Sequence, residues 1–247
     1  MPETTVTAIV LRRSDSGEND RRLTLFTREL GKIEAIAKGA RKGGSRLAGV
    51  SEPLTVAELQ IAIGRVRNFV TQAQPVSSLP NVRTSYERIL CGQALAELVA
   101  VHYPFTAPHP EAFDDLYAAL SALGGDGDPA VPLVWFAAHT LAAEGHMPDW
   151  AVCAVTGRPL SGPEVWYSPA AGGSVGRAEA EQFHDSARAS REAMIAISMT
   201  APLPAPPPRL KRAAECSEVL FRTWQGVLDA PLPAWEAAVR SMNGSGV

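Results

Sequence analysis

The sequence has few cysteines and no long apolar run. Its 247 residues contain only Cys91, Cys153 and Cys216, which lie far apart. They form no disulfide framework, and such usage fits a reducing compartment. No run of about 18 apolar residues occurs, so we expect no membrane span. Residues 1–5 lack the basic and then apolar order of a secretion signal. We therefore expect a cytoplasmic protein with a buried core and no membrane partner.

The sequence also lacks the common catalytic motifs. Its five histidines share no metal-ligand spacing. Neither Thr156-Gly157 nor Gly172-Gly173 is followed by the Gly-Lys-Ser/Thr of a phosphate loop, and no Gly-x-Ser-x-Gly elbow occurs. Asp114 and Asp115 are adjacent on a predicted helix, where neighbouring side chains point in different directions. We therefore predict no enzyme and no catalytic residues.

Positive charge is present but unevenly distributed. The formal net charge is −3, yet residues 1–80 carry twelve Lys and Arg against eight Asp and Glu. The remainder carries eleven basic and eighteen acidic residues. A basic module on an acidic body indicates an anionic ligand, and a nucleic acid is the natural candidate. Solvated loops also carry charge, so the charge pattern alone leaves the ligand open.

Residues 1–80 show the alternation of half-buried strands. Strand-like runs cover residues 5–12, 22–27, 32–38, 55–63 and 68–74, with breaks at glycine. Five short strands in about 75 residues predict a small barrel. The five-stranded oligonucleotide-binding barrel, or OB-fold, is the leading interpretation, although an SH3-like barrel fits the same periodicity. We predict an OB-fold nucleic-acid-binding domain over residues 1–80.

The connection from Lys38 to Pro53 is long and rich in glycine and basic residues. A loop of this length in a compact domain is usually functional or disordered, and each of its cations can neutralise a phosphate. The candidate stacking aromatics are only Phe26 and Phe69, and either could belong to the core. Phosphate contacts should therefore dominate. The predicted DNA-binding residues are Arg12, Arg13, Arg21, Arg22, Lys32, Lys38, Arg41, Lys42, Arg46, Arg65 and Arg67.

Residues 81–247 have the apolar stripes of helices. The stripes cover residues 86–101, 113–123, 133–141, 183–197, 210–228 and 235–240. Cys91 and Cys216 fall on such stripes and are expected in the core. The fold class is therefore α+β, with an N-terminal five-stranded OB-fold barrel followed by a mostly helical domain over residues 81–247.

One segment, residues 148–180, interrupts the helical pattern. It is short of apolar residues and dense in glycine and proline. Small insertions of this kind are often held by a metal, but only Cys153 could bind a soft metal here. The alternative is a small subdomain that Trp150, Trp166 and Tyr167 hold by packing.

Several short motifs occur in a fixed order along the chain. The N-terminal ones are Ile9-Val10-Leu11-Arg12, Gly17-Glu18-Asn19-Asp20-Arg21, Leu25-Phe26-Thr27-Arg28-Glu29-Leu30-Gly31-Lys32, Lys38-Gly39-Ala40-Arg41 and Ser45-Arg46-Leu47. The later ones are Gly145-His146-Met147-Pro148, Thr156-Gly157-Arg158, and Tyr167-Ser168-Pro169 with Gly172-Gly173. In these motifs and their order the chain resembles the bacterial RecO family of recombination mediators along nearly its full length.

The later motifs resemble the family's zinc knuckle, whose pattern has two Cys-x-x-Cys pairs. Cys153 occupies the first ligand position and Thr156 the second, while the third and fourth fall near Gly176 and Glu179. Three of the four ligands are missing. We therefore predict a degenerate zinc-knuckle-like insertion over residues 148–180, with no zinc and no cofactor.

The resemblance implies a function in DNA repair and recombination. Family members bind single- and double-stranded DNA, anneal complementary strands, and act with RecR to load RecA onto DNA coated by single-strand binding protein. In some members the helical domain takes the acidic and apolar C-terminal tail of that binding protein. For this role we predict Arg209, Lys211 and Arg212. The expected location is the cytoplasm, at the nucleoid.

The main alternative is a non-enzymatic adaptor whose basic barrel binds an acidic peptide or partner. The weak overall charge and the sparse stacking aromatics favour it slightly. DNA binding measured at two salt concentrations distinguishes the two functions.

Overall fold

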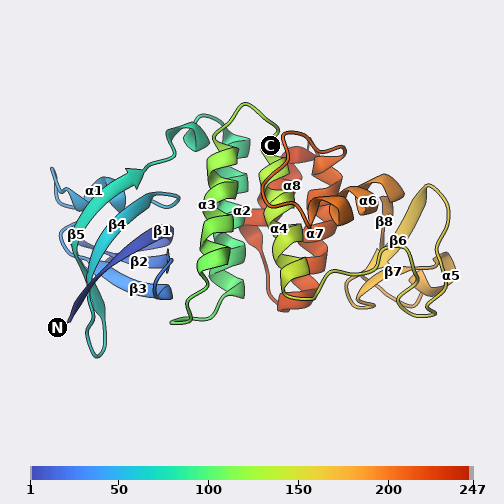
Figure 1. Ribbon diagram of the computed structural model, residues 1–247, viewed down its shortest axis with the longest axis horizontal. Coiled ribbons are helices and arrows are strands. Elements are labelled where there is room, and N and C mark those ends of the chain that lie inside the picture. Colours follow the sequence, from blue (N-terminus) through green and yellow to red (C-terminus); the bar gives the residue numbers. More distant parts are fainter. Residues whose placement is uncertain (1, 245–247) are drawn as a thin grey trace. The chain divides into compact units, whose positions relative to one another are not determined.

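The computed structural model describes residues 2–244, and its first part is a closed barrel (Figure 1). The strands are joined in the order β1-β2-β3-β5-β4. All neighbouring strands are antiparallel except β3 and β5, which are parallel. This arrangement confirms the predicted OB-fold. The strands are β1 (Glu3–Ser16), β2 (Asp20–Thr27), β3 (Gly31–Ala37), β4 (Val56–Ala62) and β5 (Asn68–Ser77).

Alternation along these strands fills the barrel. Leu23 and Leu25 of β2, Ile33 of β3, and Leu59 and Ile61 of β4 are all buried in one apolar cluster. The period-two spacing sends every second side chain inward, so the intervening residues of β2 and β3 face outward. The barrel is thus a scaffold that displays the outer side of two adjacent strands.

The barrel and four helical elements form one compact unit, Met1–Gly124; α1 lies between β3 and β4, and the others follow the barrel. The Ser85 hydroxyl caps α2 by accepting a hydrogen bond from the Arg88 backbone N–H, and a proline opens α3. The Phe26 ring packs against Tyr103 and Phe113, with ring centroids 5.3 and 6.1 Å apart. The helical elements are α1 (Leu47–Val50), the 3₁₀ turn η1 (Pro80–Arg83), α2 (Tyr86–His102) and α3 (Pro110–Leu123).

The backbone at Gly31 lies too close to the backbone at Ala107 to leave room for a side chain. Gly31 has φ of +70°, and a Cβ built on it would lie 1.9 Å from the Ala107 carbonyl oxygen. Only glycine fits both requirements. The unit extends to Gly124, whereas the predicted domain boundary lies at residue 80, so that boundary stays a prediction.

The second compact unit, Gly125–Val247, is built mainly from helices. Trp135, Trp224 and Trp235 are fully buried, and their indole N–H groups donate to Leu203 O, Ala137 O and Ser217 Oγ respectively. Buried indoles with satisfied donors stabilise such a core. The main helices are α4 (Ala130–Ala143), α6 (Arg191–Thr200), α7 (Ala213–Leu228) and α8 (Pro233–Met242).

Cys91 and Cys216 are buried, as predicted. Burial raises the pKa of the Cys216 thiol to about 12, so this thiol stays protonated and acts as a small apolar side chain.

The predicted helix over residues 183–197 is wrong in its first half. Residues Ala187–Ser190 form strand β8, which pairs with β6 (Glu164–Ser168), and α6 begins only at Arg191. The Glu215 carboxylate accepts hydrogen bonds from the Ser190 backbone N–H and hydroxyl, while the Ser190 hydroxyl accepts one from Ala193 N. Ser190 therefore ends the strand and caps the helix.

Two strands of the predicted insertion, residues 148–180, form a small sheet with β8, which lies beyond the end of the insertion. It has the order β7-β6-β8, with β7 at Gly173–Val175, and α5 (Arg177–Ala180) follows β7. Val175 and Ala180 pack with Cys153 in a small apolar cluster. Across residues 2–244 the structure contains no helix that is both long and apolar enough to cross a membrane.

Candidate nucleic-acid interface

The outer side of β2 and β3 is divided into a covered part and an open part. Cross-strand pairs on this side are Phe26 with Lys32 and Arg22 with Ile36. Tyr103, which follows α2, and Phe113 of α3 cover Phe26, which is fully buried. Arg22 is exposed. Only the Arg22 end of the face is therefore available to a ligand.

Lys32 lies at the covered end. Its side chain is only 5% exposed, and Nζ donates a hydrogen bond to Ala100 O at 2.6 Å. Nζ also lies 4.4 Å from the centroid of the Phe105 ring. Burial, with a smaller effect of the Arg12 charge, lowers the pKa of Lys32. The interpretation of Lys32 as a phosphate ligand is therefore replaced by a structural one: it joins β3 to α2.

Arg21 is also engaged within the fold. Its guanidinium donates to Ala48 O, Ser51 Oγ and the Glu52 carboxylate, at 3.0, 2.6 and 3.0 Å. Arg13 reaches the same Glu52 carboxylate at 2.8 Å. Arg21 thereby anchors the loop between β3 and β4, and its contact with DNA stays a prediction.

The remaining predicted cations are exposed. The basic loop, residues 38–46, is tied to the β1–β2 turn because Gly39 N donates to Asp20 Oδ1 and Arg41 N donates to Asn19 O. Arg41 also forms an ion pair of 3.3 Å with Asp15. Seven of these exposed cations make no ion pair within residues 2–244: Arg12, Arg22, Lys38, Lys42, Arg46, Arg65 and Arg67.

An aromatic ring lies beside one of these cations, Lys38. Phe69 is half-buried and pairs with Ile36 across the parallel β3–β5 ladder. The Lys38 ammonium lies 4.7 Å from the centroid of its ring. A ring beside a cation on an open strand face is the arrangement on which single-stranded bases stack. Of the two aromatics considered from the sequence, Phe26 is core and Phe69 is available.

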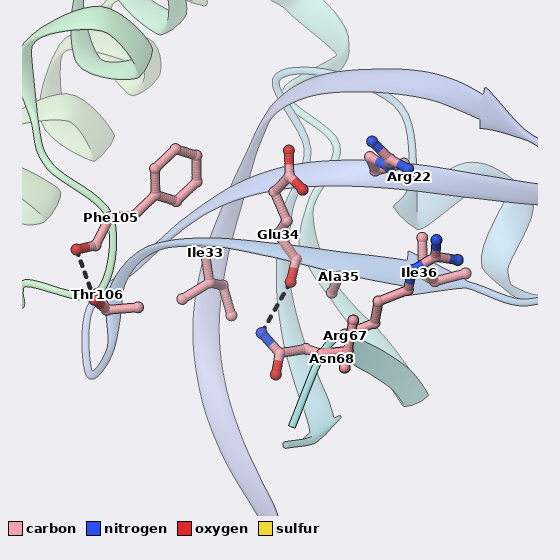
Figure 2. Close-up of a pocket in the computed structure, with 10 residues that line it drawn as sticks. Arg22, Ile33, Glu34, Ala35, Ile36, Arg67, Asn68, Phe105 and Thr106 are labelled. Atoms are coloured by element: carbon pink, nitrogen blue, oxygen red, sulfur yellow. Dashed lines mark hydrogen bonds between the residues drawn. The ribbon is translucent and has the colours of Figure 1, made fainter. Parts of the chain in front are cut away.

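A pocket of about 440 Å³ opens next to this face (Figure 2). It lies where the β3 edge is unpaired, between the bridge of Lys32 to Phe105 and the ladder to β5 that starts at Ala35. The Asn68 side-chain amide donates to the Glu34 carbonyl oxygen at 2.9 Å and closes one side. Sequence reasoning missed this pocket because its walls come from segments far apart in the chain.

A groove of about 410 Å³ lies in the second unit, between α6 and the segment that precedes α7. Its lining includes the exposed Ile195 and Met199, which are 51% and 68% exposed. Arg209 and Lys211 also line it, whereas Arg212 does not. Arg212 has φ of +57° at the start of α7 and pairs with Glu215 and Glu192. The structure thus brings two of the three predicted partner residues to one apolar groove.

The insertion resembles a zinc knuckle in its sequence motifs, but only one of the four ligand positions, Cys153, carries a cysteine. Burial opposes ionisation of Cys153, but hydrogen bonds from the Thr156 hydroxyl and from the backbone N–H groups of Gly176, Thr156 and Val155 outweigh it and lower the thiol pKa. A Cβ on Gly176 would lie 2.2 Å from Glu179 Oε2. The four ligand positions of the resembled pattern therefore meet around one point, with one thiol among them. Among residues 2–244 no three His, Cys, Asp or Glu side chains gather as a metal site, so the residues present do not fit zinc.

Two family models match the chain. "Recombination protein O N terminal" matches residues 1–79, and "Recombination protein O C terminal" matches residues 83–221. The chain belongs to the RecO family. Relatives named "DNA repair protein RecO" include those of Desulfitobacterium hafniense (strain DSM 10664 / DCB-2), Roseiflexus sp. (strain RS-1) and Gloeobacter violaceus.

These RecO relatives are similar over much of the chain. The identities are 36% over 170 residues, 39% over 168 and 33% over 171, in the same order. The alignments cover 69%, 68% and 68% of this chain. They cover 62%, 59% and 66% of the relatives, which is less than two thirds of each relative's own length.

Proposed function

We propose that this protein is a DNA repair and recombination mediator. It binds single- and double-stranded DNA, anneals complementary single strands, and helps load RecA onto DNA coated by single-strand binding protein, together with RecR. Membership of the RecO family supports the repair role. The observation that carries DNA binding is the group of exposed barrel cations that make no ion pair within residues 2–244, one of which, Lys38, lies beside the Phe69 ring.

The proposed mechanism needs charge and geometry but no covalent step. Cations on the basic loop neutralise the phosphates of two strands and lower their mutual repulsion, so that complementary bases can pair. Phe69 holds unstacked bases on the open strand face. We therefore propose that the protein is not an enzyme and works in the cytoplasm, at the nucleoid.

A salt titration tests DNA binding at the basic loop. We expect replacement of Lys38, Arg41, Lys42 and Arg46 by alanine to weaken binding and to flatten the dependence of log K on log salt. Each lost contact to a single strand removes about 0.7 from the slope, so four contacts remove about 3. Fluorescence anisotropy with a labelled oligonucleotide measures both effects.

A matched control separates local contacts from overall charge. Four exposed arginines of the second unit carry the same total charge: Arg158, Arg177, Arg188 and Arg240. Their replacement by alanine should leave the slope near that of the parent. If the parent and the basic-loop variant have equal slopes of log K against log salt, this loop does not bind DNA. If the parent binds an acidic peptide and no DNA, the adaptor function replaces the proposed one.

The groove in the second unit supports a further partner contact. The proposed ligand is the acidic and apolar C-terminal tail of single-strand binding protein. Ile195 and Met199 offer apolar contact, while Arg209 and Lys211 offer charge to its carboxylates. Arg212 is left out because it already pairs with two glutamates.

Charge reversal tests this contact. Arg209→Glu with Lys211→Glu should weaken binding of a labelled tail peptide at least about tenfold, because two attractive contacts become repulsive. Arg158→Glu, on an exposed residue outside the groove, is the control. If the double variant binds the tail peptide as tightly as the parent, the groove is not the binding site for the tail. This conclusion does not depend on the DNA result.

A further inference from the structure

The pocket beside β3 combines charges of both signs that have no partner. Arg22, Glu34 and Arg67 line it, and none of the three makes an ion pair within residues 2–244. Figure 2 shows all three as side chains around the pocket, with the Glu34 carboxylate carried by β3. Cations alone would suit any polyanion. The unpaired carboxylate among them indicates a ligand that also donates hydrogen bonds.

The same pocket has apolar walls. Val66 is 90% exposed and Phe105 is 51% exposed, and both line it together with Ile36. Covering this exposed apolar area with a ligand would be favourable. The volume lies within the range of small-ligand sites. A flat ring with a charged attachment fits this combination better than a peptide or a bare phosphate does.

We infer that this pocket holds one unstacked nucleobase of the bound strand and prefers guanine. The inference rests on the proposed DNA binding and adds base selectivity to it. The base ring packs on Phe105 and Val66, the flanking phosphates pair with Arg22 and Arg67, and the Glu34 carboxylate reads the base edge.

The preference follows from donor chemistry. An ionised carboxylate only accepts hydrogen bonds. Guanine presents two adjacent donors on its pairing edge, the N1–H and the N2 amino group, so both carboxylate oxygens are used. Cytosine and adenine present one amino group each on that edge. Thymine flanks its single N–H with carbonyl oxygens, which the carboxylate repels.

Single-base substitutions in one oligonucleotide test the inference. The probe is a labelled dT strand in which one central position is dT, dC, dG or deoxyinosine, which lacks the N2 amino group. We expect the dG strand to bind the parent protein about five- to tenfold more tightly than the dT strand, the lower end for a two-donor contact. Deoxyinosine should lose most of that preference.

The Glu34→Gln variant identifies the reading residue. Removing a negative charge strengthens binding of every strand, so the ratio of dG to dT affinity is the measurement. The ratio should fall to about 1, because the amide cannot accept on both atoms. Glu58→Gln, on an exposed glutamate of β4 outside the pocket, should keep the parent ratio.

The outcomes are distinguishable. Tight binding of all strands with equal affinity overturns base selectivity and leaves DNA binding intact. A preference that persists in Glu34→Gln overturns the role of Glu34. Competition by free dGMP at the affinity of the dG strand overturns a strand subsite in favour of a mononucleotide site. Absence of binding to every strand overturns both the proposed function and this inference.

Discussion

Basic residues of the barrel divide according to what their side chains already contact. Lys32 and Arg21 donate to backbone and side-chain oxygens of neighbouring elements. Lys42 and Arg46 are exposed and make no ion pair within residues 2–244. Residues of the first kind hold the interface in shape, and those of the second kind are available to phosphate.

A matched pair of lysine variants tests this division. Lys32→Ala should lower the free energy of unfolding by about 1 to 3 kcal/mol, because the partly buried Ala100 carbonyl oxygen loses its donor. Lys42→Ala should change it by less than about 0.5 kcal/mol, as surface changes do. Urea unfolding measures both.

DNA affinity should show the opposite pattern. Lys42→Ala weakens binding, while folded Lys32→Ala binds as the parent does. Loss of DNA affinity in Lys32→Ala at unchanged stability would return Lys32 to the interface.

At the scale of an element, the knuckle holds its form through backbone hydrogen bonds. Cys153 N donates to Arg158 O at 2.8 Å, and Ala154 N donates to Ser174 O at 2.7 Å. Gly157 N donates to Cys153 O at 2.7 Å and closes the turn. The turn is therefore bonded to itself and to β7 through protein groups.

Metal removal tests this interpretation. Incubation with EDTA should leave the midpoint of thermal unfolding unchanged, and the purified protein should contain no stoichiometric zinc. A drop in the midpoint that added zinc reverses would refute metal independence. Differential scanning fluorimetry with elemental analysis gives both readouts.

Restored ligands provide the positive control. Thr156→Cys, Gly176→Cys and Glu179→Cys together recreate four thiols around one point, and φ of −68° at Gly176 accepts a side chain. This variant should bind one zinc ion and unfold at a higher temperature when zinc is added.

At the scale of the whole molecule, local patterns predicted the elements and missed contacts made across the chain. Alternation at Leu23 and Leu25 was sufficient for a strand, because burial of every second side chain is a local property. Lys32 looked available because its acceptor, Ala100, lies 68 residues further along. Strand β8 was missed because its pairing with β6, and not its own side chains, holds it extended.

The functional site shows the same limit. The basic loop was visible as a run of charge. The pocket was not, because it requires Phe105 to lie beside β3 and Asn68 to reach the Glu34 carbonyl oxygen. A sequence contains no local signal for an unpaired sheet edge between two such segments.

Truncation tests how the first unit is built. Residues 1–124 include the helices that cover Phe26, and they supply the Asp114 carboxylate that binds Arg28 at 2.9 and 2.8 Å. We expect this fragment to unfold in one cooperative transition and to bind DNA with the salt slope of the whole chain. Circular dichroism during thermal unfolding and anisotropy measure the two properties.

Residues 1–80 are the matched shorter fragment. They keep every strand of the barrel but expose Phe26 and leave the Lys32 ammonium without the Ala100 acceptor. A small barrel has a low free energy of unfolding. This loss of buried area should therefore leave the fragment unfolded or aggregated. If it instead unfolds at the same temperature as residues 1–124, the barrel is an independent domain and the boundary predicted at residue 80 is right. The only effect of α2 and α3 on the barrel would then be to cover the Phe26 end of the β2–β3 face, so that DNA reaches the other end.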